Sequence, residues 1–271
     1  MPYLAVVCLA LVHGLSFLLP VGENMHIAVL PRLLGWPPQP LPQHLACHAG
    51  TVISLVIVLR REVGRALKGA WQLVRGRWRP ETGLFVSLTI ALLPIGVLRA
   101  LGAPSYVSSF GLGRIDYLAM TGILMAALMW LADRYSLAIR RIEHMSPVDG
   151  LVLGLAQLLA FFPGTGLAPL SMMTARLLGF ERPDAVRIAF LVALAAFAGE
   201  VLLSGSRLYL AGELHPAPEL AIAAAGAAAA GLFAASALLE WLKRRSLAPF
   251  LVYRLLASAA VLVWFYMVFR G

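Results

Sequence analysis

The run GLAQLLAFFPGTGLAPLSMMTARLLGF, residues 154–180, is apolar but is broken in its middle by Pro163 and Gly164. Proline removes a backbone donor and clashes with the preceding turn, and glycine loosens the backbone, so a continuous helix is disfavoured there. We therefore expect two half-helices, the second beginning at the small-residue turn Gly164-Thr165-Gly166. The backbone N–H groups and the dipole of such a helix start favour an anion such as phosphate. The alternative is a proline-kinked spanning helix that binds no ligand.

The composition around this run is that of a membrane protein. Of 271 residues, 61% are hydrophobic and 13% are charged, which is more apolar material than one soluble core of this length would bury. The cysteines, Cys8 and Cys47, lie in apolar runs and give no support to a disulfide or a zinc site. The basic residues behind the formal charge of +9 gather between the apolar runs, as they do in the cytoplasmic loops of membrane proteins. We therefore expect no nucleic-acid partner.

Apolar runs and basic loops together predict the topology. The apolar runs are 3–19, 24–34, 45–59, 84–102, 117–133, 151–180, 185–204, 217–240 and 249–269. A span needs about 20 residues, so we expect an all-α polytopic protein with about six transmembrane helices and two broken, re-entrant segments, 3–34 and 151–180. Lys and Arg gather in 60–83, 134–149 and 241–248, whereas 21–44, 103–116 and 205–216 carry one each. The basic segments are therefore predicted to be cytoplasmic.

The two broken segments resemble each other. Pro20-Val21-Gly22 interrupts the first much as Pro163-Gly164 interrupts the second. With the predicted topology they enter from opposite faces and meet near the midplane, which is the geometry of an inverted repeat with a central site. We expect one integral-membrane domain over 1–271, with 60–83 as a basic cytoplasmic linker.

Ionisable side chains inside apolar runs are costly, so each requires a reason. The first broken segment and the span after it hold His13, Glu23, His26 and His48. Such a set could ligate a metal, relay a proton or bind phosphate. Alternatively, each histidine is a neutral packing residue. Glu23 and His26 are three apart, which places them on one face if this segment is helical.

Five stretches of the chain resemble the undecaprenyl-diphosphate phosphatase family, the bacitracin-resistance type. They are VHGLSFLLPVGENMHI at 12–27, LACHAGTVISLVIVLRREV at 45–63, LVLGLAQLLAFFPGTG at 151–166, LLGFERPDAVRIAFL at 177–191 and APFLVYRLL at 248–256. The resemblance implies six spans, two re-entrant segments and a multi-pass protein of the bacterial inner membrane. It implies removal of the terminal phosphate of undecaprenyl diphosphate in cell-wall lipid-carrier recycling, with a divalent cation, magnesium or calcium. The resemblance is also compatible with a homodimer.

The catalytic motifs depart from the family pattern. The family's E-G-L-T-E-F-L-P-V-S-S-x-G-H corresponds to residues 13–26, where His13 and Phe17 replace the glutamates and His26 keeps the final histidine. The family's P-G-T-S-R-S-G-A-T corresponds to residues 163–171, where Leu167 replaces the arginine. An isobutyl group cannot supply the charge stabilisation of a guanidinium.

Two functions remain open from the sequence. The first is a diphosphatase with a rebuilt site. In it His26 is nucleophile or base and Ser171 a further catalytic candidate, while His13, Glu23 and His48 hold a metal or a proton. Substrate binding would then involve Pro163, Gly164, Thr165, Gly166 and Gln157. The second is a non-catalytic relative that binds or moves a polyprenyl phosphate or another phospholipid between leaflets.

Overall fold

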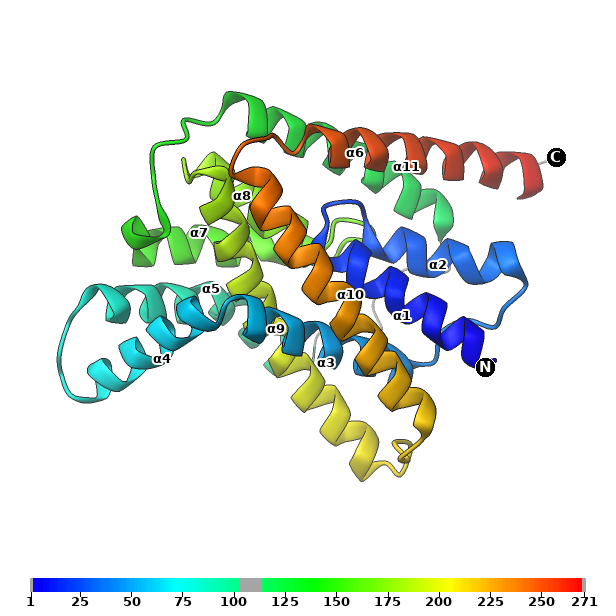
Figure 1. Ribbon diagram of the computed structural model, residues 1–271, viewed down its shortest axis with the longest axis horizontal. Helices are drawn as coiled ribbons and strands as arrows, with labels where there is room; N and C mark the ends of the chain where they lie inside the picture. The colour runs from blue at the N-terminus through cyan, green and yellow to red at the C-terminus, as the bar shows by residue number, and fades with distance from the viewer. Residues whose placement is uncertain (1, 103–113, 270–271) are drawn as a thin grey trace.

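A computed structural model describes residues 2–102 and 114–269, and its regular structure is helical (Figure 1). Within these ranges, six helices are long and apolar enough to cross a membrane. They are α3 (Leu41–Val58), α5 (Pro80–Ala100), α6 (Ile115–Tyr135), α9 (Arg182–Leu210), α10 (Pro218–Leu242) and α11 (Ala248–Phe269). The predicted all-α, multi-pass fold is thereby confirmed. Of the predicted loop 103–116, residues 103–113 lie outside the described residues.

The first broken run forms two helices, α1 (Tyr3–Leu18) and α2 (Glu23–Leu34). The chain leaves α1 at Leu19 in an extended conformation and enters α2 through Gly22, whose φ is 93°. Glycine adopts this left-handed region without the Cβ clash that other residues meet. The predicted interruption at Pro20-Val21-Gly22 is therefore present.

The second broken run has the same form. Helix α7 (Pro147–Gln157) continues as a short 3-10 turn, η2 (Leu158–Phe161), and α8 (Leu167–Leu177) begins after the predicted turn. Gly164 has a φ of 84°, and a Cβ there would collide with the hydroxyl of Thr121 on α6. This close approach and the positive φ explain why glycine stands at the break.

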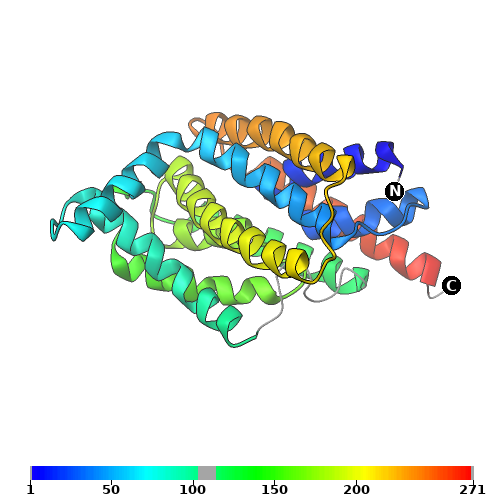
Figure 2. The same cartoon turned by 90° about the horizontal axis from the view of Figure 1, so that it is seen from below.

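The basic segment 60–83, which was predicted to be a linker, is largely helical. Helix α4 covers Arg60–Val74, and α5 begins at Pro80, where proline is tolerated because the first helical N–H has no partner. Leu67, Trp71 and Val74 are exposed along α4 between basic side chains. A helix of this kind suits a membrane surface. Both views place α4 at the end of the molecule opposite the two termini (Figures 1 and 2).

The two halves of the chain repeat one order of elements, a broken helix pair followed by three long helices, and the first half has α4 as an additional helix between α3 and α5. Helix α1 packs against α10, and α7 packs correspondingly against α5, while α6 and α11 lie side by side (Figure 1). Small residues allow the closest approaches: a Cβ on Gly50 of α3 would collide with the carbonyl of Ala224 on α10. This packing brings α1, α2, α3 and α8 around the two breaks.

Candidate functional site

Residues of both breaks line one small cavity. It is bounded by Ser16, Phe17, Gly22, Glu23 and Asn24 of the first broken run and by Gly164, Gly166, Leu167, Ala168 and Pro169 of the second. Its volume is about 10 Å³, roughly the space that a single water molecule requires. The two breaks are thus in contact, and a phosphate group would have to widen the space between them.

Arg254 of α11 bonds to the second break and borders the first. Its side chain is fully buried, and Nη2 donates to the carbonyl oxygens of Gly164 at 2.6 Å and Thr165 at 3.3 Å. A Cβ on Gly22 would lie 3.6 Å from Nε, so the guanidinium also borders the first break. Among the described residues, no carboxylate forms an ion pair with Arg254. A buried cation without an anionic partner is costly and suits an anionic ligand.

His26 lies in the first turn of α2, directly after the first break. Its Nδ1 lies 2.7 Å from the carbonyl oxygen of Gly22, and its Nε2 lies 2.9 Å from the hydroxyl of Tyr253. Because a carbonyl only accepts, Nδ1 carries the hydrogen in the neutral ring, and Nε2 is left as an acceptor toward Tyr253. An imidazole held in this tautomer can take a proton at Nε2.

Two apolar cavities meet at His26 and Tyr253. One, of about 480 Å³, runs between α1 and α11 past Val12, Leu15 and Phe250. The other, of about 310 Å³, continues along α2 and α11 past Val29. Both contain His26 and Tyr253 in their walls, and their remaining lining is almost entirely apolar. The polar pair His26 and Tyr253 thus has apolar walls on both sides, which suits a hydrocarbon chain that carries a polar head.

A group of histidines lies beyond Glu23. His13 Nδ1 is 3.1 Å and His44 Nε2 is 3.6 Å from Glu23 Oε1. His48 packs against His13, with ring centroids 4.6 Å apart, and stacks on Phe197 at 4.4 Å. Three of the four predicted ionisable residues, His13, Glu23 and His48, therefore come together. His26 does not join them, since its Nε2 lies 2.9 Å from the hydroxyl of Tyr253 on α11 instead.

Comparison with known proteins places this arrangement in a family. Residues 6–260 match the model of the bacitracin resistance protein BacA. The chain belongs to the BacA family. It is 33% identical to undecaprenyl-diphosphatase 1 of Rhodospirillum rubrum over 97% of this chain and 95% of that protein. It is 32% identical to an undecaprenyl-diphosphatase of Magnetococcus marinus, over 93% and 95%, and to undecaprenyl-diphosphatase 1 of Paramagnetospirillum magneticum, over 97% of each.

Two apolar side chains lie in this BacA-family chain at positions where the resemblance implies a glutamate and an arginine. Phe17 and Leu167, each about 4% exposed, belong to the main hydrophobic core and line the cavity between the breaks. Phe17 packs edge-to-face on Phe197 and stacks beside His13. Where the family pattern has a carboxylate and a guanidinium, this chain has a pair of apolar side chains that pack into the core.

The predicted substrate-binding residues have structural partners. The carbonyl of Pro163 accepts from Thr121 at 2.5 Å, and the Thr165 hydroxyl donates to the carbonyl of Phe162 at 2.8 Å. Gln157 is buried and donates to the carbonyl of Ala91 at 3.2 Å, away from the cavity. The backbone N–H groups at the start of α8 remain suited to an anion, because no carbonyl lies four residues before them within the helix.

Ser171 lies in the second turn of α8, completely buried. Its hydroxyl has no hydrogen-bond partner among the described residues. It is not among the residues that line the cavity between the breaks.

Three residues of this region, Arg254, Tyr253 and His44, were not predicted from the sequence. Arg254 carried a detectable signal, since an arginine within the apolar run 249–269 is costly in a membrane. His44 lies just before an apolar run, where a polar side chain is ordinary. Tyr253 gave no signal, because tyrosine is common in membrane helices.

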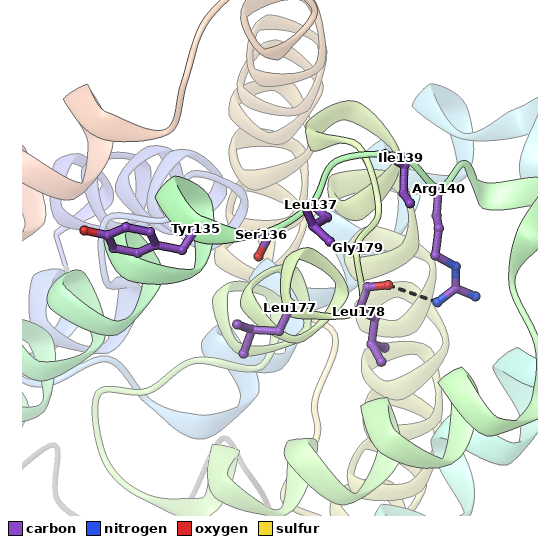
Figure 3. Close-up of a pocket in the computed structure, with 8 residues that line it drawn as sticks. All are labelled: Tyr135, Ser136, Leu137, Ile139, Arg140, Leu177, Leu178 and Gly179. Carbon is purple, nitrogen blue, oxygen red and sulfur yellow. Dashed lines mark hydrogen bonds between the residues drawn. The ribbon is translucent and has the colours of Figure 1, made fainter.

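A further cavity, of about 400 Å³, lies where the loop after α6 meets the end of α8 (Figure 3). Its charged residue, Arg140, donates to the carbonyl of Leu178 at 2.9 Å and forms an ion pair with Asp149 at 2.6 Å. The hydrogen bond to Asp149 raises the pKa of Arg140 above its ordinary value. Arg140 thus joins the loop to α7 and α8, and the cavity offers little further chemistry.

Proposed function

We propose that this protein is a polyprenyl-diphosphate phosphatase of the bacterial cytoplasmic membrane, acting on undecaprenyl diphosphate in lipid-carrier recycling. The observation that carries the proposal is the buried guanidinium of Arg254 beside both breaks, which has no ion-pair partner among the described residues. It provides a positive charge in the region where Leu167 cannot. Membership of the BacA family and the bacterial relatives named undecaprenyl-diphosphatase support the substrate and the location.

The polyprenyl chain would lie in one of the two apolar cavities, with its diphosphate beside His26 and Tyr253, which both cavities share. The terminal phosphate would then enter between the breaks, where Arg254 and the N–H groups of Gly166 and Leu167 oppose its charge. Widening of the 10 Å³ cavity accompanies this entry. Binding energy from the long apolar tail favours that change.

His26 acts as the general base in this proposal. Its Nε2 takes a proton from a water molecule, and the water oxygen bonds to the terminal phosphorus. The bridging P–O bond breaks, inorganic phosphate leaves, and the lipid monophosphate remains. Tyr253, with its hydroxyl 2.9 Å from Nε2, orients the imidazole. The proton that Nε2 has taken from water then passes to the bridging oxygen of the departing lipid phosphate.

The proposal is tested by measuring phosphate release from undecaprenyl diphosphate by the purified protein, with and without divalent metal and chelator. Undecaprenyl monophosphate serves as the matched control lipid. We expect release from the diphosphate alone.

A second candidate function, lipid-phosphate binding or transport without hydrolysis, is favoured by one observation. Phe17 and Leu167 make the meeting point of the breaks apolar and nearly closed. Saturable binding of the diphosphate lipid with no phosphate release under any metal condition would support this function instead.

A further inference from the structure

Three side chains from three different helices converge beside the cavity between the breaks. His13 lies in α1, Glu23 is the first residue of α2, and His44 lies in the first turn of α3. Single ligand atoms of the three residues all lie within 4.8 Å of one another. Glu23 Oε1 is common to both short distances, 3.1 Å to His13 Nδ1 and 3.6 Å to His44 Nε2.

These atoms are buried and have no hydrogen-bond partner. His13 is completely buried and His44 is 5% exposed. Nδ1 and Nε2 of His13, Oε1 of Glu23 and Nε2 of His44 have no hydrogen-bond partner among the described residues. His13 Nδ1 and Glu23 Oε1 are close, but their geometry is not that of a hydrogen bond. Buried polar atoms are normally paired, so a cluster of unpaired acceptors indicates a ligand that accepts their lone pairs.

We propose that His13, Glu23 and His44 bind a first-row transition metal ion of the zinc type. Magnesium and calcium, which the family resemblance implies, require a shell of oxygen donors, and this site offers one carboxylate and two imidazoles. That donor set does not fit either ion. Two histidines and a glutamate are instead a ligand set that zinc takes at about 2.0–2.2 Å, with a fourth position left open.

Two of the three ligand separations agree with such an ion, and the third, between His13 and His44, is within 4.8 Å. Ligands at these bond lengths around a tetrahedral centre lie about 3.3 Å from one another, and the two short distances are 3.1 and 3.6 Å. His48 holds the ligand rings in place, since its ring centroid lies 4.6 Å from that of His13 and 4.8 Å from that of His44. We assign His48 a positioning role.

The assigned ion does not depend on the proposed hydrolysis, because metal binding is measurable without any substrate. Glu23 connects the two sites, since it also lines the cavity between the breaks. When bound, such an ion supplies positive charge and Lewis acidity at the edge of that cavity.

The test is the metal content of the purified protein, prepared without a polyhistidine tag, stripped with chelator and reloaded with Zn²⁺ or Co²⁺. We expect one equivalent of metal by elemental analysis and the intense visible absorption of four-coordinate Co²⁺. Millimolar Mg²⁺ or Ca²⁺ should not displace it. Loss of an outer partner of a metal ligand weakens binding about 10–100-fold, so we expect His13→Gln, Glu23→Gln and His44→Gln each to weaken it by at least about 100-fold.

His215→Gln provides the matched control, because His215 is exposed in the loop between α9 and α10. It should bind metal as the unaltered protein does. Gel filtration and thermal unfolding of each variant separate loss of a ligand from loss of the fold. The assignment is overturned if the unaltered protein takes up no stoichiometric Zn²⁺ or Co²⁺, if the three ligand variants bind like His215→Gln, or if Mg²⁺ or Ca²⁺ competes at equal concentration.

Discussion

The guanidinium of Arg254 donates a 2.6 Å hydrogen bond to the carbonyl oxygen of Gly164, joining two residues that are 90 positions apart in the chain. The last helix of the protein thus fixes the break in the second half. It does so next to Gly22, which opens the second helix of the first half. One buried side chain therefore holds the second break, borders the first and provides charge beside both.

Arg254→Met should abolish most of the phosphate release while preserving the fold. Removal of one charge-stabilising donor commonly lowers kcat by about 10²–10³-fold. The lost hydrogen bonds cost about 1–3 kcal/mol, and relief of the buried charge offsets part of this. Steady-state kinetics and thermal unfolding measure the two effects. The exposed Arg207→Met is the matched control, and equal activities of these two variants would exclude a role for Arg254.

His26→Ala should lower the rate by about 10²–10⁴-fold, the usual contribution of a general base. Tyr253→Phe should have a smaller effect, because it removes only the hydroxyl that orients Nε2. Phosphate release is measured for both variants and for the exposed control His215→Ala, and the loss of rate should be largest for His26→Ala and absent for the control. Full activity of His26→Ala would contradict the proposed mechanism.

Leu167→Arg alone should not raise activity and should destabilise the protein. Leu167 is 4% exposed and packs in the same core as Phe17, and an uncompensated buried charge costs about 3–5 kcal/mol. The double variant Phe17→Glu/Leu167→Arg supplies the missing partner and should recover part of this loss. A double-mutant cycle of thermal unfolding measures the coupling. Additive effects would show that positions 17 and 167 do not interact.

Gly164→Ala should destabilise the protein, because the residue has a φ of 84° and a Cβ would collide with Thr121. A left-handed conformation costs a non-glycine residue about 1–2 kcal/mol before any collision is counted. Gly83→Ala is the control, since Gly83 lies in α5 with no atom near its missing Cβ. There alanine should stabilise by up to about 1 kcal/mol. Thermal unfolding in detergent gives the melting temperature of each variant. Equal changes in melting temperature would contradict the left-handed turn at Gly164.

Single cysteines introduced in a Cys8→Ala/Cys47→Ala background test the predicted topology. Positions Pro38 and Ala211 should react with an impermeant thiol reagent from outside, and Lys68 and Arg244 only after permeabilisation. All four side chains are exposed, so burial does not prevent labelling, and the basic loops should face the cytoplasm. The reverse pattern would overturn the predicted orientation.

The sequence by itself determined the membrane class, the helical fold and both breaks. Long apolar runs can be satisfied in a bilayer only by helices, and the Pro20-to-Gly22 and Pro163-Gly164 interruptions are local backbone restrictions that act wherever the chain lies. The resemblance to the family added the expectation of six spans and two re-entrant segments. These features depend on neighbours in sequence, and for that reason they were predictable.

Only the tertiary structure decided which polar groups meet. Spacing along α2 favoured Glu23 and His26 as a pair, but packing sends Glu23 to His13 and His44 and sends His26 to Tyr253. Arg254 reaches a loop that is 90 residues away in sequence. Side-chain direction at such distances is set by how helices cross, and no local pattern encodes that crossing.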